Sequence, residues 1–207
     1  MSEHSKPVSP LLSRLRTETR DQHDAIEHTL ALLDGDLTRA TYRQRLEQFY
    51  GFYKPVEDRL FGEGSPLEAW LDLKGRYKAP LLEADMKALD GQPAKEVLRC
   101  PDLPSLAGIA EYFGCMYVLE GATLGGVLIS RHIQRQLGMT ASTGGLFFSG
   151  YGGRTGAMWQ EFRVAINAFS LVTDRQDSIV ASACTTFETL RHWCEARQAD
   201  EQPNLRS

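Results

Sequence analysis

Three features of the sequence predict an all-α fold in a single domain. Apolar residues recur at helical spacing in several long segments, and no segment shows the alternation of a half-buried strand. The run from Tyr112 to Leu137 is largely apolar and contains no proline, which is typical of a long helix. No repeat or change in composition marks a linker within the 207 residues. We therefore expect one domain over residues 1–207, with flexible tails at 1–9 and 198–207.

The first two expected helices begin and end at recognisable capping residues and helix breakers. The first covers residues 10–33 and ends at the Asp-Gly-Asp turn of residues 34–36. The second covers residues 38–60, begins at a capping threonine and should be kinked by Pro55.

The later helices are separated by glycine and proline. They are expected at residues 66–73, 79–89, 105–138, 155–172 and 174–197. Pro66 suits the first turn of the shortest of them, and Gly138 should end the longest. A glycine-rich loop with an apolar patch, residues 140–156, connects the longest helix to the last two.

Composition argues against several partners and compartments. The formal net charge of −4 gives no reason to expect nucleic acid or an anionic membrane as a partner. The four cysteines form no CxxC pair and no zinc spacing, and Cys115 and Cys184 lie in apolar helical segments. Glu120 lies near the centre of the apolar run, which disfavours a membrane span. Because no signal-like segment opens the chain, we expect a cytoplasmic protein.

Four glycines interrupt the long apolar helix: Gly114, Gly121, Gly125 and Gly126. Each lowers helix stability by roughly 1 kcal/mol relative to alanine, so together they cost about 4 kcal/mol. The first three fall on one stripe of the helix, with Tyr117 beside them. Such a stripe allows close approach either by a neighbouring helix or by a flat ligand lying across the backbone. The residues alone leave both explanations open.

His23 is the strongest candidate for a metal ligand. It lies on the apolar face of the first helix, where a histidine is often a hydrogen-bonded core residue. Arg16 and Arg20 precede it by seven and three residues and project to the same side. Glu27, four residues later, could accept a hydrogen bond from one imidazole nitrogen and leave the other free. A histidine lined by cations suits a metal-bearing ligand with carboxylates, such as haem with its two propionates.

Other sequence patterns for metal or nucleophile chemistry are weaker or missing. His28 lies about 140° around the helix from His23. His132 and His192 stand among charged residues near helix ends, where solvated or capping roles are expected. The sequence contains no paired Glu-x-x-His motifs of a di-iron bundle, and no GxxxxGK[ST], GxSxG or HExxH motif.

The ordered set of motifs resembles the haem oxygenase family, and more closely its bacterial branch, in which the glycine helix reads YVLEG-x-x-LGG. The matching stretch is residues 117–126. The family's ligand histidine, followed four residues later by a glutamate, is matched by His23 and Glu27. Its propionate-binding cations are matched by Arg16, Arg20 and Arg163. The resemblance covers about residues 10–172.

The resemblance implies a helical fold with haem held between two helices. His23 would be the proximal iron ligand, and Gly121, Gly125 and Gly126 would form the part of the distal helix that passes over the haem. Haem b would be the cofactor and also the substrate. With O2 and electrons from an external ferredoxin- or NADPH-linked donor, it would be converted to biliverdin, carbon monoxide and ferrous iron. The implied partners are a redox donor protein and a biliverdin acceptor such as a bacteriophytochrome, with no nucleic acid and no membrane.

Ala122 departs from the pattern of the animal enzymes, which place an aspartate there to organise water near the bound dioxygen. Proton delivery is then expected to use water held by backbone carbonyls or by another polar group, with Tyr117 as the first candidate. The sequence also lacks the hydrophobic C-terminal tail of membrane-anchored members. Two alternatives stay open: a haem carrier or sensor that ligates through His23 without degrading haem, and a related fold that binds another small molecule or a partner protein.

Overall fold

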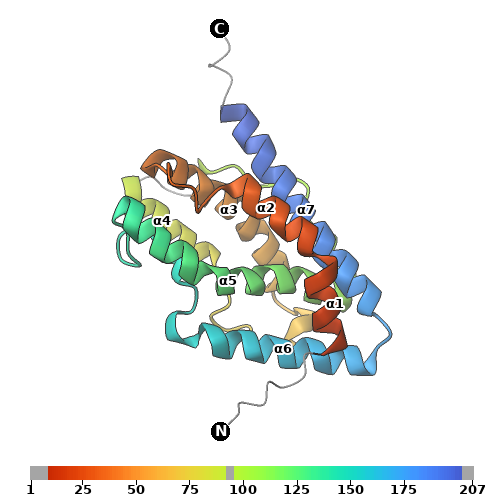
Figure 1. Cartoon of the computed structure of the whole chain (residues 1–207). Helices are drawn as coiled ribbons and strands as arrows, with labels where there is room; N and C mark the ends of the chain where they lie inside the picture. Colours follow the sequence, from red (N-terminus) through yellow and green to blue (C-terminus); the bar gives the residue numbers. More distant parts are fainter. Residues whose placement is uncertain (1–8, 92–95, 202–207) are drawn as a thin grey trace.

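All regular elements in the part of the chain that the structure describes are helical. The computed structural model describes residues 9–91 and 96–201. In chain order the elements are α1 Pro10–Glu18, α2 Arg20–Leu30, α3 Arg39–Leu60, η1 Pro66–Ala69, α4 Ala79–Asp90, α5 Ile109–Leu137, η3 Phe147–Ser149, η4 Gly152–Arg154, α6 Thr155–Val172 and α7 Gln176–Glu201 (Figure 1). Because no strand occurs within these ranges, the all-α prediction is confirmed.

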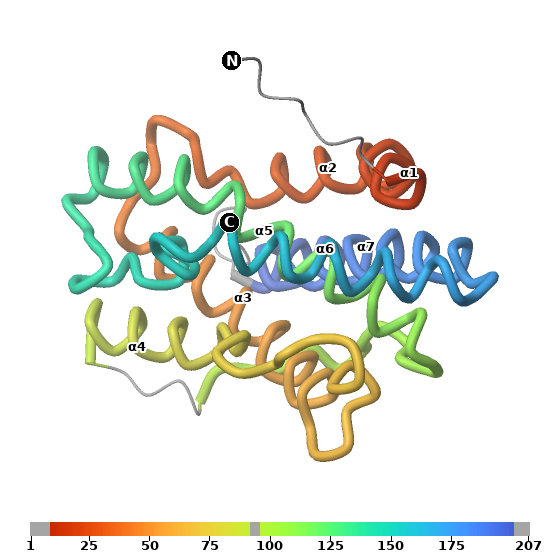
Figure 2. Tube along the Cα trace, turned by 90° about the horizontal axis from the view of Figure 1, so that it is seen from below, coloured from red at the N-terminus to blue at the C-terminus, as the bar shows by residue number. Residues whose placement is uncertain are grey.

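The central helix is α5, and its packing explains its apolar sequence. Its most extensive contacts are with α7, and it also packs against α3, α6, η1 and η3. Figure 2 shows α1 and α2 on one side of the molecule and α3 and α4 on the other, with α6 and α7 between them. Among the described helices, α5 is the one long and apolar enough to cross a membrane, but half of its apolar segment is buried inside the fold. Core packing therefore accounts for its hydrophobicity.

The prediction of a single helix over residues 10–33 is wrong, because the chain forms two helices that meet at Thr19. Thr19 leaves the helical conformation, with φ −99° and ψ 5°, and its hydroxyl donates to the Leu15 carbonyl oxygen at 2.7 Å. A threonine that bonds back to the preceding turn often bends a helix. The second helix then ends at Leu30, because Ala31 adopts a left-handed conformation with φ 49°. The break gives α2 a direction different from that of α1 (Figure 1).

Three further boundaries differ from the expectation. The helix expected at residues 66–73 is only the short 3-10 helix η1. The long helix begins at Ile109 instead of near Ser105, because Gly108 has an extended backbone. The last helix continues to Glu201, beyond the expected end at residue 197.

The described ends of the chain are partly ordered by capping. Ser9, expected in the N-terminal tail, caps α1 by accepting a hydrogen bond from the Leu12 N–H at 3.2 Å. Its hydroxyl also donates to Asn167 Oδ1 of α6 at 2.5 Å. The rest of the expected tails, residues 1–8 and 202–207, lies outside the described residues.

A buried carboxylate holds the loop after α5 against the core. The two oxygens of Asp85 accept the backbone N–H groups of Leu146 and Phe147, each at 2.7 Å. Phe147 and Phe148 then pack among the aromatic rings of α3. This arrangement brings the backbone of Phe148 against α5 at Gly126, where an added Cβ would lie 2.5 Å from the Phe148 carbonyl oxygen.

Glu57 is a second buried carboxylate that binds backbone groups, and it makes stability depend on pH. Its oxygens accept the N–H groups of Lys78 at 2.7 Å and Ala79 at 2.9 Å, at the start of α4. Burial raises the pKa of Glu57 from 4.5 to about 7, against the opposing effect of these two hydrogen bonds. In the unfolded chain the carboxyl ionises near its ordinary pKa. Its contribution to stability is therefore fully present below about pH 4.5 and is lost as the pH rises through about 7.

We expect the free energy of unfolding of the wild type, relative to that of Glu57→Gln, to fall by about 2–3 kcal/mol between about pH 4.5 and 7.5. Urea unfolding of both proteins at constant ionic strength measures this difference, since the other titrating groups are common to both. A difference that stays constant over this range would contradict the prediction.

Candidate functional site

Several site residues expected from the sequence lie on α2 and on the face that α5 turns toward α2, and the two helices run in the same general direction (Figure 1). The chain joins them at two places. Tyr117 of α5 interacts with the Thr19 side chain, just before α2. Farther along, His132 Nε2 lies 3.0 Å from the Asp34 carbonyl oxygen, just after α2. These two contacts are about 22 Å apart along α5. Between them, α2 packs mainly against α7 instead of α5.

Between the two contacts, α5 carries a strip of residues that no other element covers. We call it the open face of α5: Gly121, Leu124, Gly125 and Leu128, which recur at helical spacing on one side. A Cβ added at either glycine would meet no atom within 4 Å. Leu124 and Leu128 are 46% and 56% exposed. An exposed apolar strip of this kind is typical of a surface that a ligand or partner covers.

The other two glycines of α5 serve packing. A Cβ on Gly114 would overlap the Ile179 carbonyl oxygen of α7, and a Cβ on Gly126 would press on the Phe148 carbonyl oxygen. The packing explanation therefore applies to Gly114 and Gly126, whereas Gly121 and Gly125 face open space. We expected Gly126 over the ligand; instead, loop backbone occupies the place of its missing side chain.

His23 lies on the exposed side of α2, and its side chain is 51% exposed. Its ring stands edge-on to Phe187 of α7, with centroids 5.7 Å apart and an interplanar angle of 80°. We expected His23 to lie on the apolar face of its helix. The apolar contact that it makes is with the ring of Phe187, and half of its side chain is exposed. The imidazole is therefore supported on one side and accessible on the other.

Two carboxylates flank the imidazole. Nε2 of His23 is 3.7 Å from Glu27 Oε1, and Nδ1 is 3.7 Å from Asp24 Oδ1. Both distances exceed a hydrogen bond, so the expected bond between His23 and Glu27 is not formed. Because both acidic side chains are exposed, a modest rotation of either one would bring a carboxylate to a ring nitrogen.

The competing histidines of residues 9–91 and 96–201 are less suited to bind a ligand at the open face. His28 is exposed on a different side of α2. His132 is buried and bonded to the Asp34 carbonyl. A ring nitrogen of His192 lies 2.8 Å from Arg191 Nη2 on α7.

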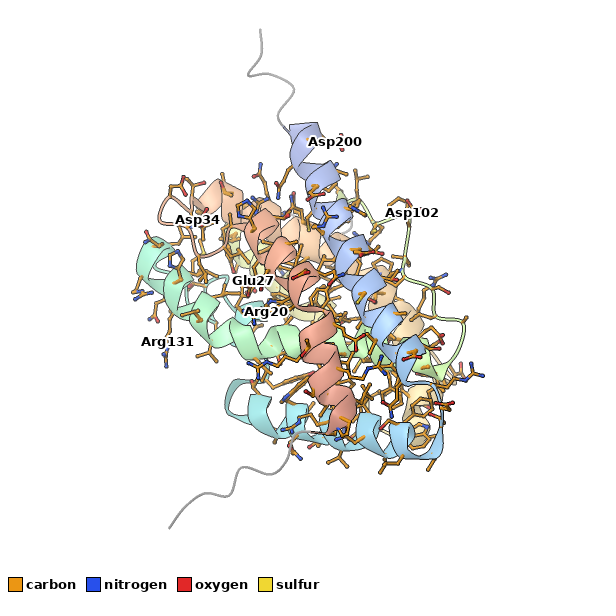
Figure 3. The ribbon with its side chains drawn as sticks, turned by 45° about the vertical axis from the view of Figure 1, so that its right-hand side comes forward. Arg20, Glu27, Asp34, Asp102, Arg131 and Asp200 are labelled. Atoms are coloured by element: carbon orange, nitrogen blue, oxygen red, sulfur yellow. The ribbon has the colours of Figure 1, made fainter. Side chains whose placement is uncertain are left out.

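Arg16 and Arg20 lie at the end of the open face where Tyr117 meets the α1–α2 junction. The positive charge of Arg16 acts on the Tyr117 hydroxyl. Arg20 Nε is 3.7 Å from Asp24 Oδ2, and the arginine side chain is 77% exposed. Figure 3 shows Arg20 where α1 and α2 pass in front of α5, with Glu27 farther along α2.

Arg163 lies on α6, where its Nη1 donates a hydrogen bond to Gln160 Oε1 of the same helix at 3.3 Å. It shares one side of that helix with Trp159 and Asn167, four residues before and after it. The Trp159 ring lies 6.0 Å from that of Tyr117, and Asn167 is bonded to Ser9 at the start of α1. Arg163 therefore lies on the helix between a residue that contacts α5 and one that contacts α1. The three arginines expected from the sequence come from three helices, α1, α2 and α6, that border this end of the open face.

Sequence reasoning missed several residues that position the site. Asp24 follows His23 directly and is four residues from Arg20, so a charge pattern could have found it. Phe187 and Trp159 come from α7 and α6, and no local pattern relates them to His23 or Tyr117.

Together, the fold and the site define a class of helical protein. It has an exposed imidazole on α2, an open glycine-bearing face on α5, and arginines at one end of that face. This arrangement suits a flat, metal-bearing ligand with acidic groups. The chain belongs to the heme oxygenase family, because the model of that family, described as Heme oxygenase, matches residues 9–196.

Solved structures of this family share the fold at low sequence identity. The NO- and CO-bound heme oxygenase of Neisseria meningitidis superposes with a TM-score of 0.78 at 20% identity, covering 91% of this chain and 92% of that one. The heme oxygenase of Leptospira interrogans superposes with a TM-score of 0.73 at 19% identity, covering 91% of this chain and 100% of that one. Heme oxygenase-1 of the cyanobacterium Synechocystis, in complex with heme, superposes with a TM-score of 0.72 at 16% identity, covering 93% of this chain and 94% of that one. No curated protein matches the sequence significantly.

Proposed function

We propose that this heme oxygenase binds its substrate between α2 and the open face of α5, with His23 as the iron ligand, and degrades it to biliverdin. The observation that carries the proposal is the pair of open glycines. Gly121 and Gly125 destabilise α5 by roughly 1 kcal/mol each relative to alanine, yet within residues 9–91 and 96–201 no atom lies within 4 Å of a Cβ added at either position. A flat ligand that must approach the helix backbone explains both residues.

The residues present fit haem. Leu124 and Leu128 offer apolar surface to the ring, and His23 offers an accessible imidazole nitrogen. Glu27 or Asp24, after a small rotation, would accept the N–H of the other nitrogen and fix the tautomer. Bound haem supplies the iron at which dioxygen is activated, and its own ring is the substrate. With external electrons the products are biliverdin, carbon monoxide and ferrous iron.

Tyr117 is the group that we assign to ordering water at the edge of the open face. Burial raises the pKa of its hydroxyl, opposed by the Thr19 side chain and by the positive charge of Arg16. The hydroxyl therefore stays protonated at neutral pH and can donate a hydrogen bond. Ala122 is exposed and offers no polar side chain there. Backbone carbonyls of α5 would supply the remaining acceptors.

The test of this function is a spectrum of purified protein mixed with haemin and followed in air after addition of a reductant such as ascorbate. Loss of the haem band with growth of biliverdin absorption is expected. A shifted haem band that survives the reductant would instead indicate a carrier or sensor, and no shift on adding haemin would exclude a haem protein. Family membership favours degradation over carriage.

His23→Ala is expected to lose the native spectrum of the ferric complex, because the iron loses its protein ligand. Turnover should fall sharply and should recover when imidazole is added, since free imidazole can occupy the vacated position. His28→Ala is the matched control, a histidine on the same helix but on a different side. An unchanged spectrum and normal turnover in His23→Ala would show that another residue is the ligand.

Arg16, Arg20 and Arg163 are expected to hold the propionates. A hydrogen bond to a charged group is worth roughly 1.5–3 kcal/mol, so each single Ala variant should bind haemin about ten- to a hundredfold more weakly. It should also change the mixture of biliverdin isomers, because the haem can rotate. Arg14→Ala, on α1 but paired with Glu18 and Asp177, is the control for lost surface charge. Wild-type affinity and products in all three variants would refute the assignment.

The remaining assignments extend from the family. We propose a cytoplasmic enzyme that receives electrons from a ferredoxin- or NADPH-linked donor protein and delivers biliverdin to an acceptor such as a bacteriophytochrome. The net charge of −4 supports the exclusion of nucleic acid and of an anionic membrane surface as partners. Turnover rates with a ferredoxin and with an NADPH-linked reductase would distinguish the two kinds of donor.

A further inference from the structure

Glu120 is a buried carboxylate of α5 that directly precedes Gly121 and is 1% exposed. Its Oε2 accepts a hydrogen bond from Arg76 Nη1 at 2.8 Å. Its Oε1 accepts bonds from the Tyr151 hydroxyl at 2.5 Å and from Lys78 Nζ at 3.3 Å. We call these four residues the Glu120 cluster. They come from α5, from the connection before α4 and from the loop before α6.

The cations of the cluster are fully engaged by hydrogen bonds. Arg76 Nε donates to the Asp72 carbonyl at 2.8 Å, and its terminal nitrogens donate to the Met158 carbonyl at 3.3 and 3.4 Å and to Glu161 at 3.0 Å. Lys78 Nζ also donates to the Arg76 carbonyl at 3.0 Å and to the Tyr151 hydroxyl at 2.5 Å. Through Met158 and Glu161 the cluster extends to α6.

Burying the charged groups of the cluster costs free energy, so a contribution to stability alone does not explain why they are buried. Burial lowers the pKa of Lys78, opposed by the charges of Glu120 and Glu57. Buried ion pairs often stabilise a fold no better than apolar side chains of the same size. Their strength lies in fixing geometry, because each partner must keep its position to stay satisfied. A cluster of this kind is therefore suited to hold one point of a helix in place.

We infer that the Glu120 cluster positions the open face of α5 against the substrate, a role that rests on the proposed function. The open face packs on no other element, and its two glycines weaken the helix there. Glu120 fixes α5 at the first of these glycines. The Thr123 hydroxyl, which donates to the Glu120 carbonyl oxygen at 2.6 Å, reinforces the same turn.

Tyr151 is the member that tests this role with the least risk to folding. Removing Glu120 itself would leave Arg76 and Lys78 buried without a counter-charge, which is strongly destabilising. Tyr151→Phe removes the hydrogen bond that the hydroxyl donates to the carboxylate and the one that it accepts from Lys78 Nζ. Lys78 Nζ keeps Glu120 and the Arg76 carbonyl as acceptors, and the ring that lies 4.2 Å from it is retained. Tyr42→Phe is the matched control.

The control removes a similar hydroxyl elsewhere in the core. Tyr42 is buried in α3, and its hydroxyl donates to the Gly144 carbonyl oxygen at 2.7 Å. Loss of this bond should affect overall stability without loosening α5 at Glu120. Comparison of the two variants therefore separates positioning from general stabilisation.

The experiment has one readout without haem and one with it. Amide hydrogen exchange of the ligand-free proteins should be about tenfold faster or more in α5 around residues 120–125 in Tyr151→Phe, and unchanged there in Tyr42→Phe. The biliverdin isomer mixture should change in Tyr151→Phe alone, because the open face no longer holds the ring in one position.

Two outcomes would overturn the inference: equal exchange in the two variants, or faster exchange in Tyr151→Phe with an unchanged isomer mixture. In either case a wild type that produces biliverdin would leave the proposed function intact. If the wild type produced no biliverdin, the proposed function would fail, and with it the role toward the substrate, whatever the exchange data showed.

Discussion

Gly125→Leu is expected to leave a folded protein that binds haemin through His23 but no longer makes biliverdin. The reason is that Gly125 faces open space: an added Cβ meets no atom of the described residues within 4 Å, so a leucine side chain can extend into the space that we assign to the ring. Leucine is a better helix former than glycine by close to 1 kcal/mol, so the ligand-free protein should be at least as stable as the wild type. Displacement of the reacting groups by about 1 Å can reduce a rate about a hundredfold, and we expect a loss of at least that size.

The measurements are thermal melting, haemin titration and the product spectrum with a reductant. Gly156→Leu is the matched control, since Gly156 is also helical, exposed and free of neighbours, but lies in the first turn of α6. It should turn over normally. If Gly125→Leu made biliverdin at the normal rate, the open face would not be the ligand surface, and the proposed position of the haem would fail.

Gly114→Val is expected to destabilise the fold by at least about 3 kcal/mol, the upper range for overpacking. Its Cβ would overlap the Ile179 carbonyl oxygen and lie 2.6 Å from Ser182 Cβ, so α5 and α7 would have to separate. Backbone atoms cannot move aside as a flexible side chain can. For a domain of this size the melting temperature should fall by about 6–12 °C.

Gly121→Val is the control for this prediction, with the same substitution on the same stripe of the same helix. Because nothing lies within 4 Å of its added Cβ, the ligand-free protein should melt within a few degrees of the wild type. Equal destabilisation of the two variants would show that Gly121 is also packed, and would remove the contrast on which the site depends.

Helix termini were accessible from the sequence because capping is local. Thr38 caps α3 through the Thr41 N–H, and Gly91 and Gly138 end α4 and α5 in the left-handed conformation. The break at Thr19 could not be predicted from the sequence, because a threonine within a helical pattern is compatible with a straight helix. Its hydroxyl bends the chain only in combination with the packing of α1 and α2 on α6 and α7.

For the candidate site, the sequence determined which residue types are available, and the tertiary structure decided what each one faces. Helical spacing places Gly114, Gly121 and Gly125 on one stripe, but a stripe two or three turns long passes from one neighbour to another. Its first glycine therefore packs on α7, while the other two face open space. Glu120 was visible in the sequence as a charge in an apolar run, but its cations Arg76 and Lys78 are brought to it by the connection before α4, more than 40 residues earlier in the chain. Local periodicity determines which residues share one side of a helix, whereas the element that packs against that side depends on long-range contacts.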